Sequence, residues 1–127
     1  MHESQVTQSI NKHVKPHAYV WKIMAAMQAG IPDCYYSGTQ SDLWIEFKLL
    51  REVPKRATTN ILPNLSELQN KWLTDRYDQG RSVAVVLVSP IGCHIYTDCM
   101  WNTPIHSDEL NLTRKQVAEW ILAKING

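Results

Sequence analysis

Hydrophobic positions at the start of the chain follow a helical spacing. Val6, Ile10 and Val14 fall on one stripe between residues 3 and 14, which predicts an amphipathic helix. Pro16 cannot continue the helix, so we expect it to end just before that residue.

Three runs rich in aromatic and β-branched residues follow this helix, and each predicts a strand. They span residues 17–24, 33–37 and 43–50. Turn-forming residues separate the second run from the third, so these two runs are expected to pair as a β-hairpin.

The second half of the chain alternates strand and helix signals. Residues 83–88 form a continuous apolar run, which is typical of a central strand covered on both faces. The other predicted elements are an exposed loop at 51–63, a helix from Asn64 or Ser66 to about Gln79, a strand at 93–96, and a helix opened by Thr113 and Gln116 that runs through Ile125. This order predicts one mixed sheet with helices packed on it.

Composition and length bound the class of protein. The 127 residues, with 44% hydrophobic and 20% charged positions, predict a single folded domain over residues 1–127. A formal net charge of +1 argues against a protein that coats polyanions, but a local basic patch is enough to bind phosphates. Four cations close together provide such a patch: Lys48, Arg51, Lys55 and Arg56.

The N-terminus lacks the basic and apolar regions of a signal peptide, and the apolar run at 83–88 is too short to span a bilayer. The cysteines are Cys34, Cys93 and Cys99, without a Cys-x-x-Cys pair, and we interpret them as reduced thiols. We therefore expect a cytoplasmic protein. Cys93, His94, Cys99 and His106 match no standard zinc spacing.

The strand at 43–50 carries the strongest chemical signal. Its side chains alternate, so Leu43, Ile45 and the other apolar positions share one face, while Glu46 and Lys48 share the opposite face. Asp33 begins the strand that pairs with it, within hairpin reach of Glu46. The alternative interpretation is a solvated charged face, which the apolar context of the strand makes less favourable.

Two polar residues lie on stripes that face inward. Glu3 projects into the stripe of the first helix, as an acid that belongs to an active site or as a first-turn acid favoured by the helix dipole. Gln69 projects into the apolar stripe of the helix near residue 70. With Ser66 it also matches a capping box, so it is a site residue, a helix cap, or both.

These segments follow the motif order of a known group of enzymes. Gly30-Ile31-Pro32-Asp33, then Ile45-Glu46-Phe47-Lys48, then Leu65-Ser66-Glu67-Leu68-Gln69-Asn70-Lys71-Trp72, after a helix that carries Glu3, resemble the PD-(D/E)XK nucleases. In detail they are similar to a stand-alone, phage-like member of the VRR-NUC branch, the virus-type replication-repair nucleases. The resemblance covers residues 3 to about 88. It implies an α/β restriction-endonuclease-like fold, in which helices flank a central mixed β-sheet (αβββαβ core).

The resemblance also implies a metal-dependent endonuclease that hydrolyses DNA. The implied ligands of Mg²⁺ or Mn²⁺ are Asp33, Glu46, the Phe47 backbone carbonyl and Glu3, the last directly or through water. Lys48 would orient and activate the attacking water, and Gln69 would position Lys48 or that water. In-line attack would leave a 5′-phosphate and a 3′-hydroxyl.

The resemblance implies branched or duplex DNA as the partner. It also implies a homodimer, whose two sites would suit a symmetric four-way junction. We expect DNA contacts from Arg51, Lys55 and Arg56, and from Lys22 unless it is only a solvated strand-end lysine. No organic cofactor and no membrane association are expected. The alternatives are a non-catalytic nucleic-acid- or protein-binding module on the same fold, and a metal-dependent hydrolase of another phosphoester.

Overall fold

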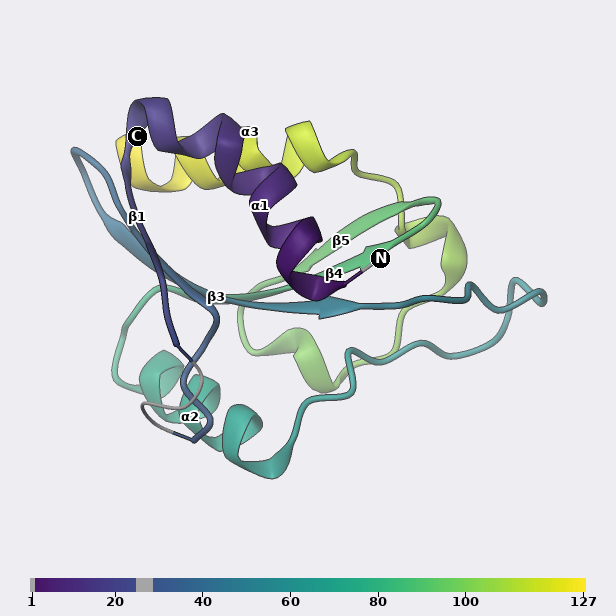
Figure 1. Cartoon of the computed structure of the whole chain (residues 1–127). Helices are drawn as coiled ribbons and strands as arrows, with labels where there is room; N and C mark the ends of the chain where they lie inside the picture. Colours follow the sequence, from purple (N-terminus) through teal and green to yellow (C-terminus); the bar gives the residue numbers. More distant parts are fainter. Residues whose placement is uncertain (1, 25–28) are drawn as a thin grey trace.

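A five-stranded β-sheet lies at the centre of the computed structural model, which describes residues 2–24 and 29–127 (Figure 1). The strands are β1 (Tyr19–Lys22), β2 (Cys34–Ser37), β3 (Asp42–Leu49), β4 (Val83–Ser89) and β5 (Gly92–Tyr96). They lie side by side in chain order. β3 and β4 are parallel, and the other neighbouring pairs are antiparallel.

Helices cover both faces of the sheet. The α-helices are α1 (Glu3–Val14), α2 (Glu67–Asp78) and α3 (Arg114–Asn126), with short 3₁₀ turns at Lys15–His17, Met100–Asn102 and Ser107–Glu109. Figure 1 shows α1 and α3 together on one side of the sheet and α2 on the other. The predicted order of an αβββαβ core, followed by a further strand and a final helix, is confirmed. No helix in the described residues has the length and apolar character needed to cross a membrane.

The alternation expected along β3 is what separates the two layers of the core. Leu43, Ile45 and Phe47 are buried against the α1 and α3 layer, whereas Trp44 packs on the α2 side. All seven residues of β4 are buried, which confirms the central strand. Because β3 and β4 are parallel, the chain must cross over between them, and it does so through residues 50–82 and α2.

The crossover contains the clearest departure from the sequence prediction. Residues 51–63 were expected to form an exposed loop, but Ile61 and Pro63 are buried. Ile61 exchanges two backbone hydrogen bonds with Ile105, at 2.8 and 2.9 Å. It belongs to the hydrophobic core on the α2 side of the sheet. The prediction of full exposure was wrong because this pairing joins segments far apart in the sequence.

Smaller differences concern the ends of elements. β1 spans four residues instead of the expected 17–24, because His17 belongs to the 3₁₀ turn that follows α1. Ser66, not Asn64, is the N-cap of α2: its hydroxyl accepts a hydrogen bond from the Gln69 amide at 3.1 Å. Thr113 caps α3 in the same way, as predicted.

A buried polar network joins α1 to β2. The Tyr36 hydroxyl donates to Asn11 Oδ1 at 2.6 Å, and Asn11 Nδ2 lies 3.6 Å from Cys34 Sγ. All three side chains are almost completely buried, so each polar atom depends on these partners.

Replacing Tyr36 with phenylalanine is expected to lower the free energy of unfolding by about 1–3 kcal/mol, because Asn11 Oδ1 loses its donor in the core. Urea denaturation measures this change. Tyr35→Phe is the matched control: the Tyr35 hydroxyl binds Asp42 at the surface, so its loss should cost less than about 0.5 kcal/mol. Equal losses in the two variants would contradict the importance of the buried network.

Candidate active site

Asp33 lies immediately before β2, where β1, β2 and β3 come together. Its backbone carbonyl accepts a hydrogen bond from the Ile23 amide at 2.7 Å, which extends the pairing of β1 and β2. Its side-chain Oδ2 accepts from the Phe47 amide at 2.9 Å. The Asp33 carboxylate is thus hydrogen-bonded to the backbone of β3 at Phe47, between Glu46 and Lys48. Burial raises the pKa of this carboxyl more than the Phe47 hydrogen bond lowers it.

Glu46 is the most deeply buried acid of the site, with only 3% of its side chain exposed. Its Oε2 atom accepts a hydrogen bond from Gln69 Nε2 at 2.9 Å and lies 3.6 Å from Lys48 Nζ. Its Oε1 atom is buried and has no hydrogen-bond partner in the described part of the chain. Burial, and next the negative charge of Asp33, raise the pKa of Glu46 to about 8.

Lys48 provides the positive charge of this group. It follows Glu46 by two residues on the same face of β3, as strand alternation predicts, and 20% of its side chain is exposed. Its ammonium lowers the pKa of both acids without cancelling the effect of their burial. The structure therefore brings Asp33, Glu46 and Lys48 together in one half-buried cluster.

Gln69 fulfils both interpretations of its sequence position. Its Oε1 atom accepts a hydrogen bond from the Ser66 amide at 3.0 Å, and its own amide bonds to the Ser66 hydroxyl, which completes the capping box of α2. Its Nε2 atom donates to Glu46 at the same time. One side chain thus closes the helix and holds the buried acid.

Two contacts keep α2 against the site. The Trp72 ring packs on Trp44 of β3, with ring centroids 5.2 Å apart. Gly30 passes close to the first turn of α2: a Cβ there would lie 2.7 Å from the Leu68 carbonyl oxygen, and its φ of +84° suits glycine. The segment that leads to Asp33 can pack this closely only because residue 30 lacks a side chain.

The residues of the cluster fit a divalent cation. Two neighbouring acids with raised pKa values, one of them with an unpaired buried oxygen, are groups that a bound cation stabilises in their charged form. No three side chains of His, Cys, Asp or Glu cluster in a metal-binding arrangement among the described residues. The remaining ligands would therefore include a backbone carbonyl and water, as is usual for Mg²⁺.

Glu3 differs from its expected environment. We expected it on a buried stripe, but it is exposed, at the start of α1. That part of the expectation was wrong because the first turn of the helix extends past the core that begins at Val6. Its negative charge still raises the pKa of Asp33 and Glu46, so it lies near the site. Its role as a metal ligand stays a prediction.

The four cations expected to contact DNA belong to two segments of the chain. Lys22 is exposed at the end of β1, and its charge lowers the pKa of Asp33. Arg51, Lys55 and Arg56 are exposed in the segment after β3, which extends beyond the sheet (Figure 1). Arg51 also lines a cavity with Arg114, a residue that the sequence analysis did not single out.

A mixed five-stranded sheet flanked by helices, with acids at the junction of β2 and β3, is the restriction-endonuclease-like fold that the sequence predicts. No protein-family model matches the chain, and no curated protein sequence matches it. Among solved structures, Hjc, a Holliday junction resolvase from the archaeal hyperthermophile Archaeoglobus fulgidus, has the same fold. The two superpose over 93% of this chain and 98% of Hjc, with a TM-score of 0.58 and 17% sequence identity. The resemblance to the VRR-NUC branch stays a prediction.

Proposed function

We propose that this chain is a metal-dependent endonuclease that hydrolyses DNA phosphodiester bonds. The observation that carries the proposal is Glu46: a buried acid with a raised pKa and an unpaired oxygen, beside a second acid and a lysine. A structural role alone does not account for this arrangement, because burying an unsatisfied carboxyl group costs stability. The likeness to a Holliday junction resolvase supports a nuclease on this fold.

Asp33, Glu46 and the Phe47 carbonyl would hold Mg²⁺ or Mn²⁺, which would supply positive charge at the scissile phosphate and lower the pKa of a bound water. Lys48 lies beside Glu46 and would orient the attacking water and offset the charge that develops on the phosphate. The water oxygen would bond to phosphorus and lose a proton to solvent, while the bond from phosphorus to the 3′-oxygen breaks and that oxygen takes up a proton from solvent. The products are a 5′-phosphate and a 3′-hydroxyl.

The substrate we propose is branched DNA, cut by a homodimer. Two sites related by a twofold axis suit the symmetry of a four-way junction. We also propose that the chain is a single domain of the VRR-NUC type, because of the motifs around Asp33, Glu46 and Gln69. We propose that it acts in the cytoplasm, because its three cysteines are free thiols.

The test is cleavage of labelled four-way junction, flap and linear duplex DNA of matched sequence. We expect cleavage with Mg²⁺ or Mn²⁺ and none with EDTA, and faster cleavage of the junction than of the duplex. DNA binding without cleavage in Mg²⁺, Mn²⁺ and EDTA alike would contradict the proposal and favour a non-catalytic binding module. Cleavage in EDTA would contradict the metal dependence.

Gln69→Glu separates the two tasks of this residue. Glutamate at this position maintains the capping box, but its carboxylate cannot donate to Glu46 and adds a negative charge beside it. We expect the cleavage rate to fall by about 10²-fold while the helix content in circular dichroism stays unchanged.

Gln116→Glu is the matched control, because Gln116 occupies the same position in the Thr113 capping box of α3. Its cleavage rate should equal that of the parent chain. A similar loss of cleavage in both variants would mean that Gln69 acts only through the helix.

A further inference from the structure

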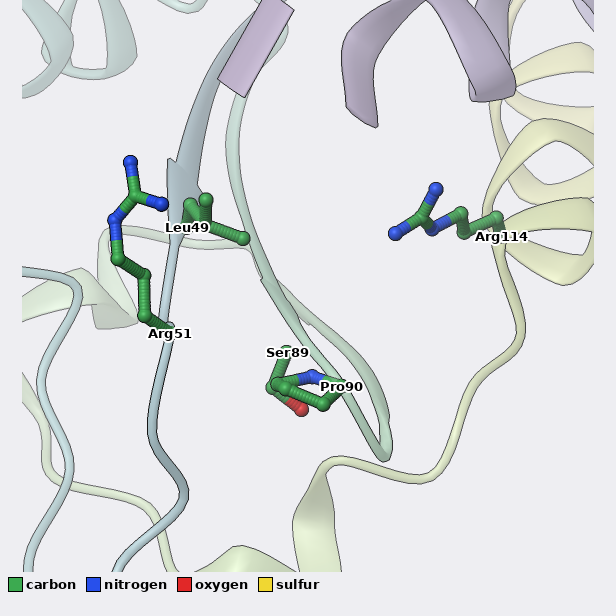
Figure 2. Close-up of a pocket in the computed structure, with 5 residues that line it drawn as sticks. All are labelled: Leu49, Arg51, Ser89, Pro90 and Arg114. Carbon is green, nitrogen blue, oxygen red and sulfur yellow. The ribbon is translucent and has the colours of Figure 1, made fainter. Parts of the chain in front are cut away.

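A cavity of about 420 Å³ lies at the carboxyl ends of the parallel strands β3 and β4 (Figure 2). Leu49 and Arg51 line it from the end of β3, Ser89 and Pro90 from the end of β4, and Arg114 from the start of α3. Three segments far apart in the sequence thus form its walls. Ligands of α/β proteins commonly bind outside the carboxyl ends of strands.

The charged groups of this cavity are two guanidinium groups. Figure 2 shows the Arg114 side chain reaching from α3 into the cavity and the Arg51 side chain beside Leu49. No acid is among the described residues that line it. The Ser89 hydroxyl is engaged in the turn after β4, where it donates to the Gly92 carbonyl at 2.7 Å. An anion would therefore be recognised mainly by the arginines.

Arg114 is held in position by α1. Its NH1 group donates to Ser9 Oγ at 2.9 Å, and the Ser9 hydroxyl donates in turn to the Val6 carbonyl at 2.7 Å. A guanidinium has five N–H donors in a planar fork, so it can bind a serine and an anion together. A cation in the first turn of a helix is disfavoured by the helix dipole, so helix stability does not explain this arginine.

The cavity adjoins the candidate active site through β3. Leu49 follows Lys48, and their side chains leave opposite faces of the strand, so the cavity lies on the α1 and α3 side of the same strand end. A polymer that crosses the end of β3 can reach both places, whereas a free anion would reach only one. The apolar walls, Leu49 and Pro90, suit the sugar of a nucleotide.

We propose that this cavity binds a backbone phosphodiester of the DNA substrate, away from the bond that is cut, through Arg51 and Arg114. The proposal rests on the proposed function, because it takes DNA as the substrate. It assigns Arg114 a role in DNA binding and makes the cavity part of the path of the DNA over the protein.

The test measures DNA binding in EDTA by fluorescence anisotropy, so that no cleavage is needed. The variants are Arg114→Gln and the matched control Lys115→Gln, which removes a charge from the next, exposed residue of α3. We expect Arg114→Gln to weaken binding about tenfold and to reduce the slope of log affinity against log salt by about one, which is the loss of one phosphate contact. Lys115→Gln should change affinity by less than about twofold.

Two further variants make the test independent of folding defects. Arg114→Lys retains the charge but not the fork, so it should restore the salt slope and only part of the affinity. Arg51→Gln removes the second, exposed guanidinium and should weaken binding to a similar degree as Arg114→Gln. Urea denaturation of each variant checks that it is folded. If Arg114→Gln does not fold, Arg51→Gln and Arg114→Lys carry the test.

Several results would overturn the proposal. Equal binding by Arg114→Gln and Lys115→Gln would remove Arg114 from the DNA path. Tight binding of inorganic phosphate by calorimetry, lost in Arg114→Gln while DNA affinity is unchanged, would make the cavity a site for a free anion.

If the arginine variants lose DNA affinity but the parent chain cuts nothing with Mg²⁺, the cavity proposal stands and the nuclease proposal fails. If the parent chain cuts DNA but Arg114→Gln binds DNA as tightly as the parent chain, the nuclease proposal stands and the cavity proposal fails.

Discussion

Replacing Lys48 with alanine is expected to reduce DNA cleavage on the order of 10³-fold while DNA affinity changes less than about threefold. The reason is its position: Nζ lies 3.6 Å from Glu46 Oε2, beside both acids, where a positive charge can orient water and stabilise charge on the phosphate. Its contribution should be larger in the transition state than in the bound complex, so the rate falls more than the affinity. Single-turnover cleavage with excess protein, together with anisotropy in EDTA, measures the two quantities separately.

Lys71→Ala is the matched control for this variant. Lys71 also contacts a carboxylate, Asp75, at 2.7 Å, but it lies on the exposed side of α2. Its removal should leave cleavage unchanged and cost less than about 1 kcal/mol of stability. Cleavage by Lys48→Ala at the parental rate would rule out the assigned role.

Replacing Glu46 with glutamine is expected to abolish metal-dependent cleavage and to stabilise the metal-free protein at high pH. The pKa of Glu46 is raised from 4.5 to about 8 in the folded chain, so the folded state retains a proton that the unfolded state loses. The stability of the parent chain should therefore be highest with respect to this group below pH 4.5 and fall as pH rises to about 8. Glutamine does not titrate, so the variant lacks this loss.

The measurable quantity is the difference in unfolding free energy between Glu46→Gln and the parent chain at two pH values. Between about pH 4 and pH 9 it should shift by roughly 4–5 kcal/mol in favour of the variant. Mg²⁺ should raise the melting temperature of the parent chain and not that of the variant. Glu119→Gln, an exposed position on α3, is the control and should show neither effect. A pH-independent difference would contradict the raised pKa of Glu46.

Local patterns were enough to predict which residues of the candidate site lie together. Strand alternation placed Glu46 and Lys48 on one face of β3, and the hairpin placed Asp33 beside them, because both relations depend on neighbours in the sequence. The Ser66 capping box gave the start of α2, and helical projection turned Gln69 inward. The contact of Gln69 with Glu46 confirms that projection.

Predictions failed where the structure depends on distant segments. Ile61 is buried through its pairing with Ile105, and no periodicity near residue 61 indicates that partner. Glu3 is exposed because the core covers only the later turns of α1, whereas a helical projection treats every turn alike. Arg114 belongs to a helix whose position on the sheet cannot be derived from its own sequence.

The double task of Gln69 gives the protein a reporter of its own site. A cation bound at Glu46, as we propose, would also restrain the side chain that closes the Ser66 cap. The amide proton of Gln69, bound to the Ser66 hydroxyl, should then exchange with solvent more slowly, while the equivalent amide of Gln116 in α3 does not change. Opening of the first turn of α2 would thus become rarer as a cation fills the acid cluster, and amide exchange at Gln69 would report cation binding.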